Sequence, residues 1–241
     1  MVKLLLEKLM LCRIAELTVE IPNGGSLAPR CKDYILESDG QPDIIIDDSL
    51  YPYEKFPQYS REAVEYTHSG LQFYRALLDL GGMMLHSSAV EYDGYAYLFS
   101  GPSGMGKSTH TGLWCNTFDT ARVINDDKPA LRCIDGIWYA YGTPWSGKSS
   151  LNVNTKVKVA GICFLERGDK NEIRRLSKKE ALVNVIAQTT RKKLTEIRID
   201  SMLSCVERVL EKIPVYEMRC LPDAEAVYTA YNAMKPSGEK K

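Results

Sequence analysis

The stretch YAYLFSGPSGMGKSTHTGLWCNTF, residues 95–118, contains a strand pattern, a glycine-rich loop and a helix pattern in direct succession. Its middle part, GPSGMGKS at 101–108, fits the phosphate-loop template G-x-x-x-x-G-K-[ST]. Such a loop binds phosphate because backbone N–H groups converge on the anion at a helix start, where the helix dipole favours negative charge. The stretch therefore predicts a triphosphate-binding loop in an α/β fold.

A second segment, GTPWSGKS at 142–149, matches the same template. Residues 149–165 after it have strand character and no helical period, so the helix start that would supply the N–H groups is missing. Pro144 also removes one backbone donor. This segment is not predicted to cradle phosphate, and two interpretations of it stay open. Either Lys148 adds charge near the phosphates and Trp145 forms a stacking or substrate wall, or Trp145 is tucked into the core of a structural loop.

Carboxylates follow a predicted strand shortly after the loop. The segment VINDD, residues 123–127, ends in Asn125, Asp126 and Asp127. Mg²⁺ needs a carboxylate at the end of a nearby strand, and phosphoryl transfer needs a group that orients or deprotonates the acceptor. Two adjacent acids can divide these tasks. The alternative is an Asp-Asp turn at a strand end.

The order of these features resembles the HPr kinase/phosphorylase family and, more distantly, the ATP-dependent phosphoenolpyruvate carboxykinases. The resemblance rests on a strand with a histidine, a hairpin, the loop, a helix and a strand ending in Asp-Asp. The matching positions are His86, Gly101, Ser103, Gly104, Gly106, Lys107, Ser108, Asp126 and Asp127. The resemblance implies an α/β fold with a mixed β-sheet core of this type, containing the phosphate loop and preceded by a β-rich N-terminal portion.

The resemblance also implies roles for these residues. ATP would bind to the loop and the helix start, that is to Gly101, Ser103, Gly104, Met105, Gly106, Lys107, Ser108 and Thr109, with Trp145 and Lys148 as further candidates. Ser108 and Asp127 would bind Mg²⁺. Asp126 would accept the proton of the acceptor hydroxyl, with His86 close to it and Lys107 on the phosphates. The family's later glycine-rich signature has no counterpart here, so HPr is not the expected acceptor, and the chain looks more like small HPr-kinase-like proteins of peptide natural-product clusters.

Composition excludes several classes of protein. The 241 residues contain 31 basic and 31 acidic side chains, whereas nucleic-acid and anionic-membrane binding need a basic surface. No stretch reaches the roughly 18 apolar residues of a membrane span. Seven cysteines without a C-x-x-C pair are typical of reduced thiols. We therefore expect a cytoplasmic protein without nucleic-acid or membrane partners, and the resemblance is compatible with a homo-oligomer.

The chain divides into three predicted parts. Residues 1–80 form a β-rich region with strands at 13–21, 32–38 and 42–47, closed by a helix from 61. Residues 81–235 form the kinase domain, with a strand at 83–92 and helices at 177–193, 200–213 and 222–235, and residues 236–241 form a frayed tail. His110 is expected on a helix surface, and His68 is expected to be a structural residue without a catalytic role. Arg167 and the basic run 191–193 are either phosphate-neutralising groups or solvated ends.

The pattern as a whole predicts an ATP-dependent kinase that transfers the γ-phosphoryl group to a hydroxyl of a peptide, a protein or a small molecule. Three alternatives use the same loop differently. A nucleotide-binding regulatory protein would bind ATP without transfer, a phosphorylase or carboxykinase-like enzyme would need an added substrate pocket, and a protein with a relic loop would not bind ATP.

Overall fold

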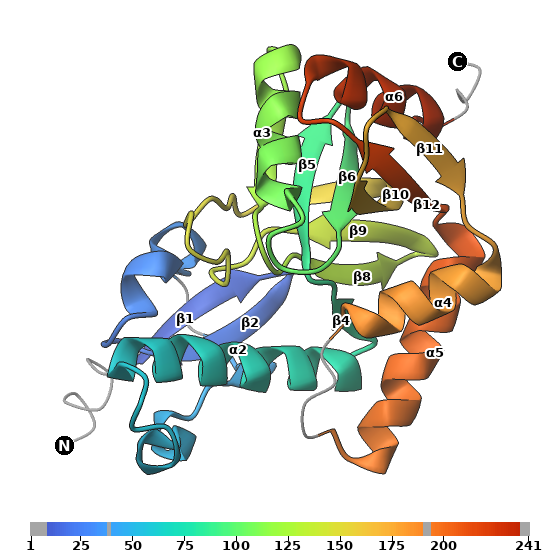
Figure 1. Ribbon diagram of the computed structural model, residues 1–241. Coiled ribbons are helices and arrows are strands. Elements are labelled where there is room, and N and C mark those ends of the chain that lie inside the picture. The colour runs from blue at the N-terminus through green and yellow to red at the C-terminus, as the bar shows by residue number, and fades with distance from the viewer. Residues whose placement is uncertain (1–8, 38–39, 190–193, 237–241) are drawn as a thin grey trace, which may run out of the picture.

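The computed structural model describes residues 9–37, 40–189 and 194–236, and within them the strands form two sheets (Figure 1). The smaller sheet belongs to the N-terminal region. In it β1 (Leu9–Ile14) pairs antiparallel with β2 (Leu17–Pro22), and β2 pairs parallel with the short β3 (Ile44–Ile45). This region therefore contains β-structure as predicted, and the short β3 lies within the predicted strand at 42–47.

Two local predictions for this region are wrong. The predicted strand at 13–21 is a hairpin, because Ala15 and Glu16 adopt positive φ angles and turn the chain. The first part of the predicted strand at 32–38 belongs instead to the 3-10 helix η1 (Ala28–Tyr34). Cys31 and Tyr34 of η1 are buried, as is Leu27 directly before it. Two more short 3-10 helices, η2 (Asp48–Leu50) and η3 (Tyr53–Lys55), lead to the first long helix.

Helix α2 (Arg61–Asp79) joins the N-terminal region to the rest of the molecule. It begins at Ser60, whose side chain accepts a hydrogen bond from the Ala63 amide. Its buried Phe73, Tyr74 and Leu77 belong to one hydrophobic cluster with side chains of β1 and β2 and with Met84 and Trp145. The hydrophobic core is therefore continuous from the N-terminal sheet into the second sheet.

The larger sheet has nine strands and is mixed, as predicted. Strand β10 (Lys156–Arg167) is its longest member and runs parallel to β6 and β12, while the other pairs are antiparallel. The remaining strands are β4 (Gly82–Met84), β5 (Ser87–Tyr92), β6 (Tyr95–Ser100), β7 (Arg122–Asn125), β8 (Ala130–Ile134), β9 (Ile137–Tyr141), β11 (Glu172–Arg175) and β12 (Val215–Cys220).

The predicted strand at 83–92 is broken at Leu85 and His86. Before the break β4 pairs with β8, and after it β5 pairs with β6 and β7, so the two halves lie in distant parts of the strand order β4-β8-β9-β10-β6-β5-β7. In Figure 1 β5 and β6 run roughly crosswise to β8 and β9. The sheet is therefore strongly curled, and His86 lies at the junction between its two parts.

Helices cover the part of the sheet around β6 on both faces. Tyr97 and Phe99 of β6 pack with α3 (Lys107–Thr117) and α6 (Ala224–Met234). The alternate residues Ala96 and Leu98 lie in the cluster that includes α4 (Lys178–Ala187) and α5 (Glu196–Lys212). Because its side chains alternate between the two helix layers, β6 lies in the middle of an α/β sandwich. Its C-terminal end leads through the glycine-rich loop to the start of α3. The predicted helix over 177–193 ends at 187, and residues 190–193 and 237–241 lie outside the described residues.

Candidate functional site

The glycine-rich loop joins β6 directly to α3, as the sequence predicts. Gly101, Gly104 and Gly106 have φ angles of +143°, +80° and +96°. Nothing lies within 4 Å of a Cβ placed on Gly104 or Gly106, so these glycines are needed for backbone conformation rather than for space. The first N–H groups of α3 have no acceptor within their own helix and are available to an anion.

Lys107 folds back over this loop. Its Nζ donates to the carbonyl oxygens of Gly101 at 3.0 Å and Pro102 at 3.2 Å, and the side chain is buried. Burial lowers the pKa of the Lys107 ammonium, and the charges of Asp127 and Asp126 partly offset that effect. The ammonium group is therefore held close to the loop.

A cavity of about 610 Å³ collects most of the residues that the sequence singled out. They come from the junction at His86, from the loop and α3, from the end of β7 and from the second template match. The predicted residues that line it are His86, Ser103, Gly104, Gly106, Lys107, Ser108, Thr109, Asp126, Asp127 and Lys148. Gly101, Met105 and Trp145 do not line this cavity. Gly147 and Ser149 do line it, although the sequence did not single them out.

The two aspartates have different surroundings within this cavity. Asp126 Oδ1 accepts a hydrogen bond from Ser88 Oγ at 2.7 Å, and Ser88 Oγ lies 2.8 Å from Thr111 Oγ1. Thr111 in turn donates to the carbonyl oxygens of Lys107 and Ser108. Asp126 is thus connected to the first turn of α3 through two hydroxyl groups.

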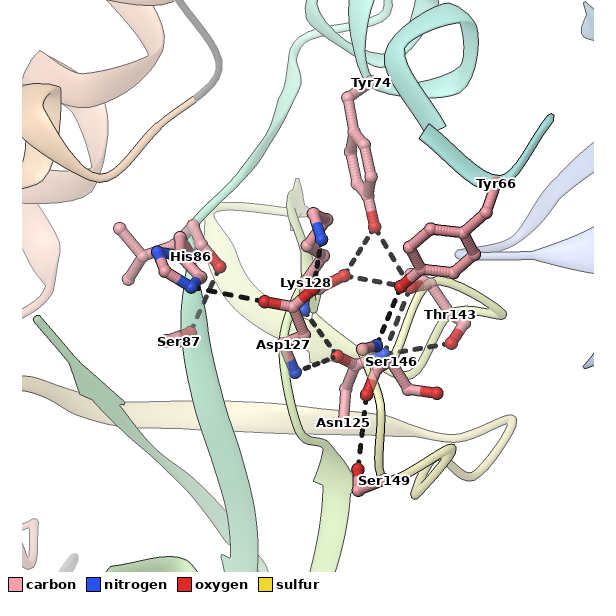
Figure 2. A network of polar contacts seen from close by, with 12 residues as sticks. Tyr66, Tyr74, His86, Ser87, Asn125, Asp127, Lys128, Thr143, Ser146 and Ser149 are labelled. Atoms are coloured by element: carbon pink, nitrogen blue, oxygen red, sulfur yellow. Dashed lines mark hydrogen bonds and ion pairs between the residues drawn. The ribbon is translucent and has the colours of Figure 1, made fainter. Parts of the chain in front are cut away.

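Asp127 lies between His86 and Lys128 (Figure 2). Its Oδ1 is 3.2 Å from His86 Nε2, and its Oδ2 pairs with Lys128 Nζ. Burial would raise the pKa of Asp127, but the contacts with His86 and Lys128 outweigh it and lower the pKa, so the carboxylate stays ionised. The other ring nitrogen, His86 Nδ1, lies 3.0 Å from Gln188 Oε1, and this contact orients the imidazole.

Asn125 fixes the backbone of this acid pair, a role that was not predicted from the sequence. Its Oδ1 accepts from the amides of Asp127 at 3.0 Å and Lys128 at 2.7 Å. Its Nδ2 donates to the carbonyl oxygen of Thr143 at 2.9 Å. The position of Asn125 directly before the Asp-Asp pair could have indicated this role, because asparagine side chains commonly accept hydrogen bonds from backbone amides two residues further along.

The second template match is not followed by a helix, as predicted. A Cβ on Gly142 would lie 2.8 Å from the Val153 carbonyl carbon and 2.9 Å from the Ile124 oxygen. Gly147 has a φ of +73°, and its N–H donates to Tyr66 Oη at 2.7 Å. Gly142 thus allows a close approach of two backbone segments, and Gly147 allows a left-handed backbone conformation beside the Asp127 side chain. Lys148 follows Gly147 and lines the loop cavity.

Trp145 is fully buried, so the prediction of an exposed stacking wall is wrong and the structural interpretation holds. Its ring stacks on Phe73 of α2 at a centroid distance of 4.8 Å, and its Nε1 donates to Ser69 Oγ at 3.0 Å. Gly70 makes room for it, because a Cβ there would lie 3.0 Å from the indole. The stacking of Trp145 on Phe73 depends on a helix that is distant in the sequence, so the residues around Trp145 do not predict it.

An apolar cavity of about 360 Å³ lies beside the loop and shares Gly104, Gly106 and Thr109 with the larger cavity. Apolar side chains from the loop, α3, β10 and the segment after β12 line it, namely Met105, Leu113, Leu165, Leu221 and Pro222. Arg167 also lines it and donates to the Gly104 carbonyl oxygen at 3.1 Å.

His110 is buried, and its predicted surface position is wrong. Its ring packs on Phe99 at a centroid distance of 4.3 Å, and its Nε2 accepts a hydrogen bond from Trp114 Nε1 at 3.2 Å. Burial lowers the pKa of His110 to about 4, so the ring is neutral near pH 7. His68 packs beside Phe56 at 5.5 Å and lies outside the loop cavity.

A third cavity, of about 410 Å³, shares His86 and Asp127 with the loop cavity and extends toward α2. Asp126 does not line it.

Several general expectations can be compared with the described residues. Their seven cysteines are free thiols, as expected. No group of three or more His, Cys, Asp or Glu side chains in this part of the chain is placed to hold a metal ion. No helix among the described residues is long and apolar enough to cross a membrane.

Among solved structures, one of the matches is to a kinase/phosphatase of low similarity. The HPr(Ser) kinase/phosphatase from Coxiella burnetii is similar at 11% identity and a TM-score of 0.37, over 62% of this chain and 93% of that chain. No curated protein matches. Residues 54–223, more than half of the chain, match the family described as SynChlorMet cassette protein ScmC. The chain therefore belongs to the ScmC family.

Proposed function

We propose that this protein is an ATP-dependent kinase that transfers the γ-phosphoryl group to a hydroxyl. The observation that supports this proposal is the meeting of Lys107 and the glycine-rich loop with two carboxylates in one cavity. Phosphoryl transfer requires positioning and charge stabilisation more than covalent chemistry by the protein. A phosphate-binding loop opposite carboxylates supplies both requirements.

The nucleotide would lie across two cavities. Its phosphates would contact the N–H groups at the start of α3 and the ammonium group of Lys107, and Lys148 would add positive charge on the opposite rim. Its base would enter the adjoining apolar cavity beside Met105 and Leu113. Arg167, which already contacts the loop at Gly104, borders that cavity and would lie near the ribose and phosphates.

The residues present fit a magnesium ion bound together with ATP. Mg²⁺ prefers oxygen ligands and commonly takes one or two from the protein, with phosphates and water as the others. We assign the Ser108 hydroxyl and the Asp126 carboxylate to it, since Asp126 is connected through Ser88 and Thr111 to the same turn of α3. The ion would supply positive charge that neutralises the phosphate oxygens.

Asp127 is then the carboxylate that faces the acceptor, which reverses the division expected from the family resemblance. It is ionised, it is oriented by His86 and Lys128, and it borders a cavity that Asp126 does not reach. The acceptor oxygen forms a bond to the γ-phosphorus while the bond from that phosphorus to the bridging oxygen of ATP breaks. ADP leaves, and the hydroxyl proton passes to Asp127.

Nucleotide binding is tested first, by the thermal shift that Mg·ATP produces. Wild-type protein should be stabilised and Lys107→Ala should lose that stabilisation. Lys179→Ala, which removes the same charge from an exposed position on α4, should retain it. A wild-type protein without any shift would refute the kinase proposal.

The two aspartates are tested by phosphotransfer from radiolabelled ATP to products of neighbouring genes, with hydrolysis of ATP as a second readout. Asp127→Asn should abolish transfer and retain the Mg·ATP shift. Asp126→Asn should weaken the magnesium-dependent part of that shift. The opposite pattern would restore the division expected from the resemblance.

A further inference from the structure

The third cavity, of about 410 Å³, has an apolar wall and a polar end. Aromatic rings from α2 and from the second template match form the wall, namely Tyr66, Tyr74 and Trp145, together with Leu71 and Met84. His86 and Asp127 form the polar end, where this cavity meets the loop cavity. Figure 2 shows Tyr66 and Tyr74 approaching the Asp127 network from α2.

The polar atoms of the aromatic wall already have partners inside the protein. Tyr66 Oη accepts from the Gly147 amide at 2.7 Å, and Tyr74 Oη donates to the Lys128 carbonyl oxygen at 2.5 Å. The indole N–H of Trp145 bonds Ser69. The wall therefore offers a ligand apolar surface, mainly from the partly exposed Tyr66 and Leu71, rather than additional donors and acceptors.

Charge at the polar end is balanced as well. Lys128 Nζ pairs with Asp127 and lies 5.4 Å from the centroid of the Tyr66 ring. A charged ligand group would have to compete with this ion pair, and burial of an unpaired charge is costly. A neutral ligand meets no such penalty.

We propose that this cavity binds the acceptor of the phosphoryl group, an inference that rests on the proposed function. The acceptor would be a neutral compound with an aryl hydroxyl group and about the size of a tyrosine side chain. The ring would pack on Tyr66 and Leu71, which are partly exposed, with the buried Trp145 behind them, and the hydroxyl would point to Asp127 and His86. The hydroxyl would then face the loop cavity, because those two residues border both spaces. Transfer would proceed as described above, with the aryl oxygen bonding to the γ-phosphorus and ADP leaving.

Three probes separate the contribution of the ring from that of the hydroxyl. N-acetyl-tyrosinamide has both, N-acetyl-phenylalaninamide has only the ring, and N-acetyl-serinamide has only the hydroxyl. Binding, measured by saturation-transfer NMR without nucleotide, should be detectable for the two ring probes and at least tenfold weaker for the serinamide. With Mg·ATP, N-acetyl-tyrosinamide should be phosphorylated faster than N-acetyl-serinamide. N-acetyl-phenylalaninamide has no hydroxyl and should not react.

Cavity-filling variants locate the binding. Ala187→Trp places a ring at an exposed position on the rim, and Val183→Trp places the same ring one turn earlier on α4, outside the cavity. The first should weaken binding of the ring probes at least tenfold and the second should not. Thr67→Trp, on the opposite rim in α2, should repeat the effect if Ala187→Trp misfolds.

The inference and the proposed function fail in different ways. Equal binding of all three probes, no binding of ring probes up to their solubility, or ring binding that both filling variants leave unchanged would overturn the inference while the Mg·ATP shift persists. Loss of the Mg·ATP shift in the wild type would instead overturn the kinase, whatever the ring probes do.

Discussion

Gly142 begins the second template match, and its replacement tests the conclusion that this segment is structural. Gly142→Ala would place a methyl group against the Val153 carbonyl, with the Ile124 oxygen at 2.9 Å on the other side. Observed Cβ atoms essentially never approach other atoms within 3.0 Å, and both obstacles are backbone. Two chain segments would have to separate.

The energetic cost follows from what holds those segments together. The Val153 amide donates to Ile124 at 3.0 Å, and the Asp126 amide donates to Leu151 at 3.1 Å. Overpacking costs about 1–3 kcal/mol. Each of the two hydrogen bonds is worth about 1 kcal/mol. We therefore expect Gly142→Ala to lower the free energy of unfolding by about 3–5 kcal/mol, a large part of the roughly 5–15 kcal/mol of an ordinary protein.

Urea unfolding followed by circular dichroism measures this loss. At an m-value of about 3 kcal/mol per molar, the midpoint should fall by about 1–2 M. Gly24→Ala is the control, because nothing lies within 4 Å of its Cβ position, and its midpoint should stay within experimental error. Gly106→Ala should behave differently, losing mainly the Mg·ATP thermal shift. A stable Gly142→Ala protein that fails to bind Mg·ATP would refute the structural reading of the second match.

Three further outcomes are expected. Trp145→Ala should lower the free energy of unfolding by about 3–5 kcal/mol in the same urea assay. Trp145→Phe should lower it much less, because a phenyl ring at this position can still stack on Phe73. Equal losses in the two variants would contradict the packing argument. His110, with a pKa lowered by burial to about 4, is protonated first in the unfolded chain, so stability should fall by about 3 kcal/mol from pH 6.5 to pH 4. His110→Gln should show a correspondingly shallower pH dependence, and an unchanged one would count against burial of this imidazole. Ser177→Ala removes the capping box of α4 and should cost about 1 kcal/mol in chemical denaturation, with no change in Mg·ATP binding.

Local patterns predicted the features that depend on neighbouring residues. The strand, loop and helix around Lys107 are encoded within one short stretch, and the Asp-Gly turns at 93–94 and 135–136 have the positive φ angles that such hairpins require. The helices after residue 177 were predicted from their apolar periodicity, whereas the mixed sheet was implied by the family resemblance.

The features that depend on distant contacts could not be predicted. The orientation of His86 requires Gln188, 102 residues further along, and the position of Gly147 requires Tyr66, 81 residues earlier. The burial of Trp145 likewise requires Phe73 of α2. No local pattern contains these pairings, so the sequence predicted most residues that line the loop cavity and missed the aromatic cavity next to it.

The break between β4 and β5 has a consequence for how this chain can vary in length. Leu85 and His86 alone connect the two strands, and Ala89 and Val90 of β5 point to opposite helix layers. Side chains of a strand alternate strictly, so one inserted or deleted residue at the junction would exchange these two faces along all of β5. Homologous chains can therefore replace the histidine at this junction by another amino acid more readily than they can change the number of residues there.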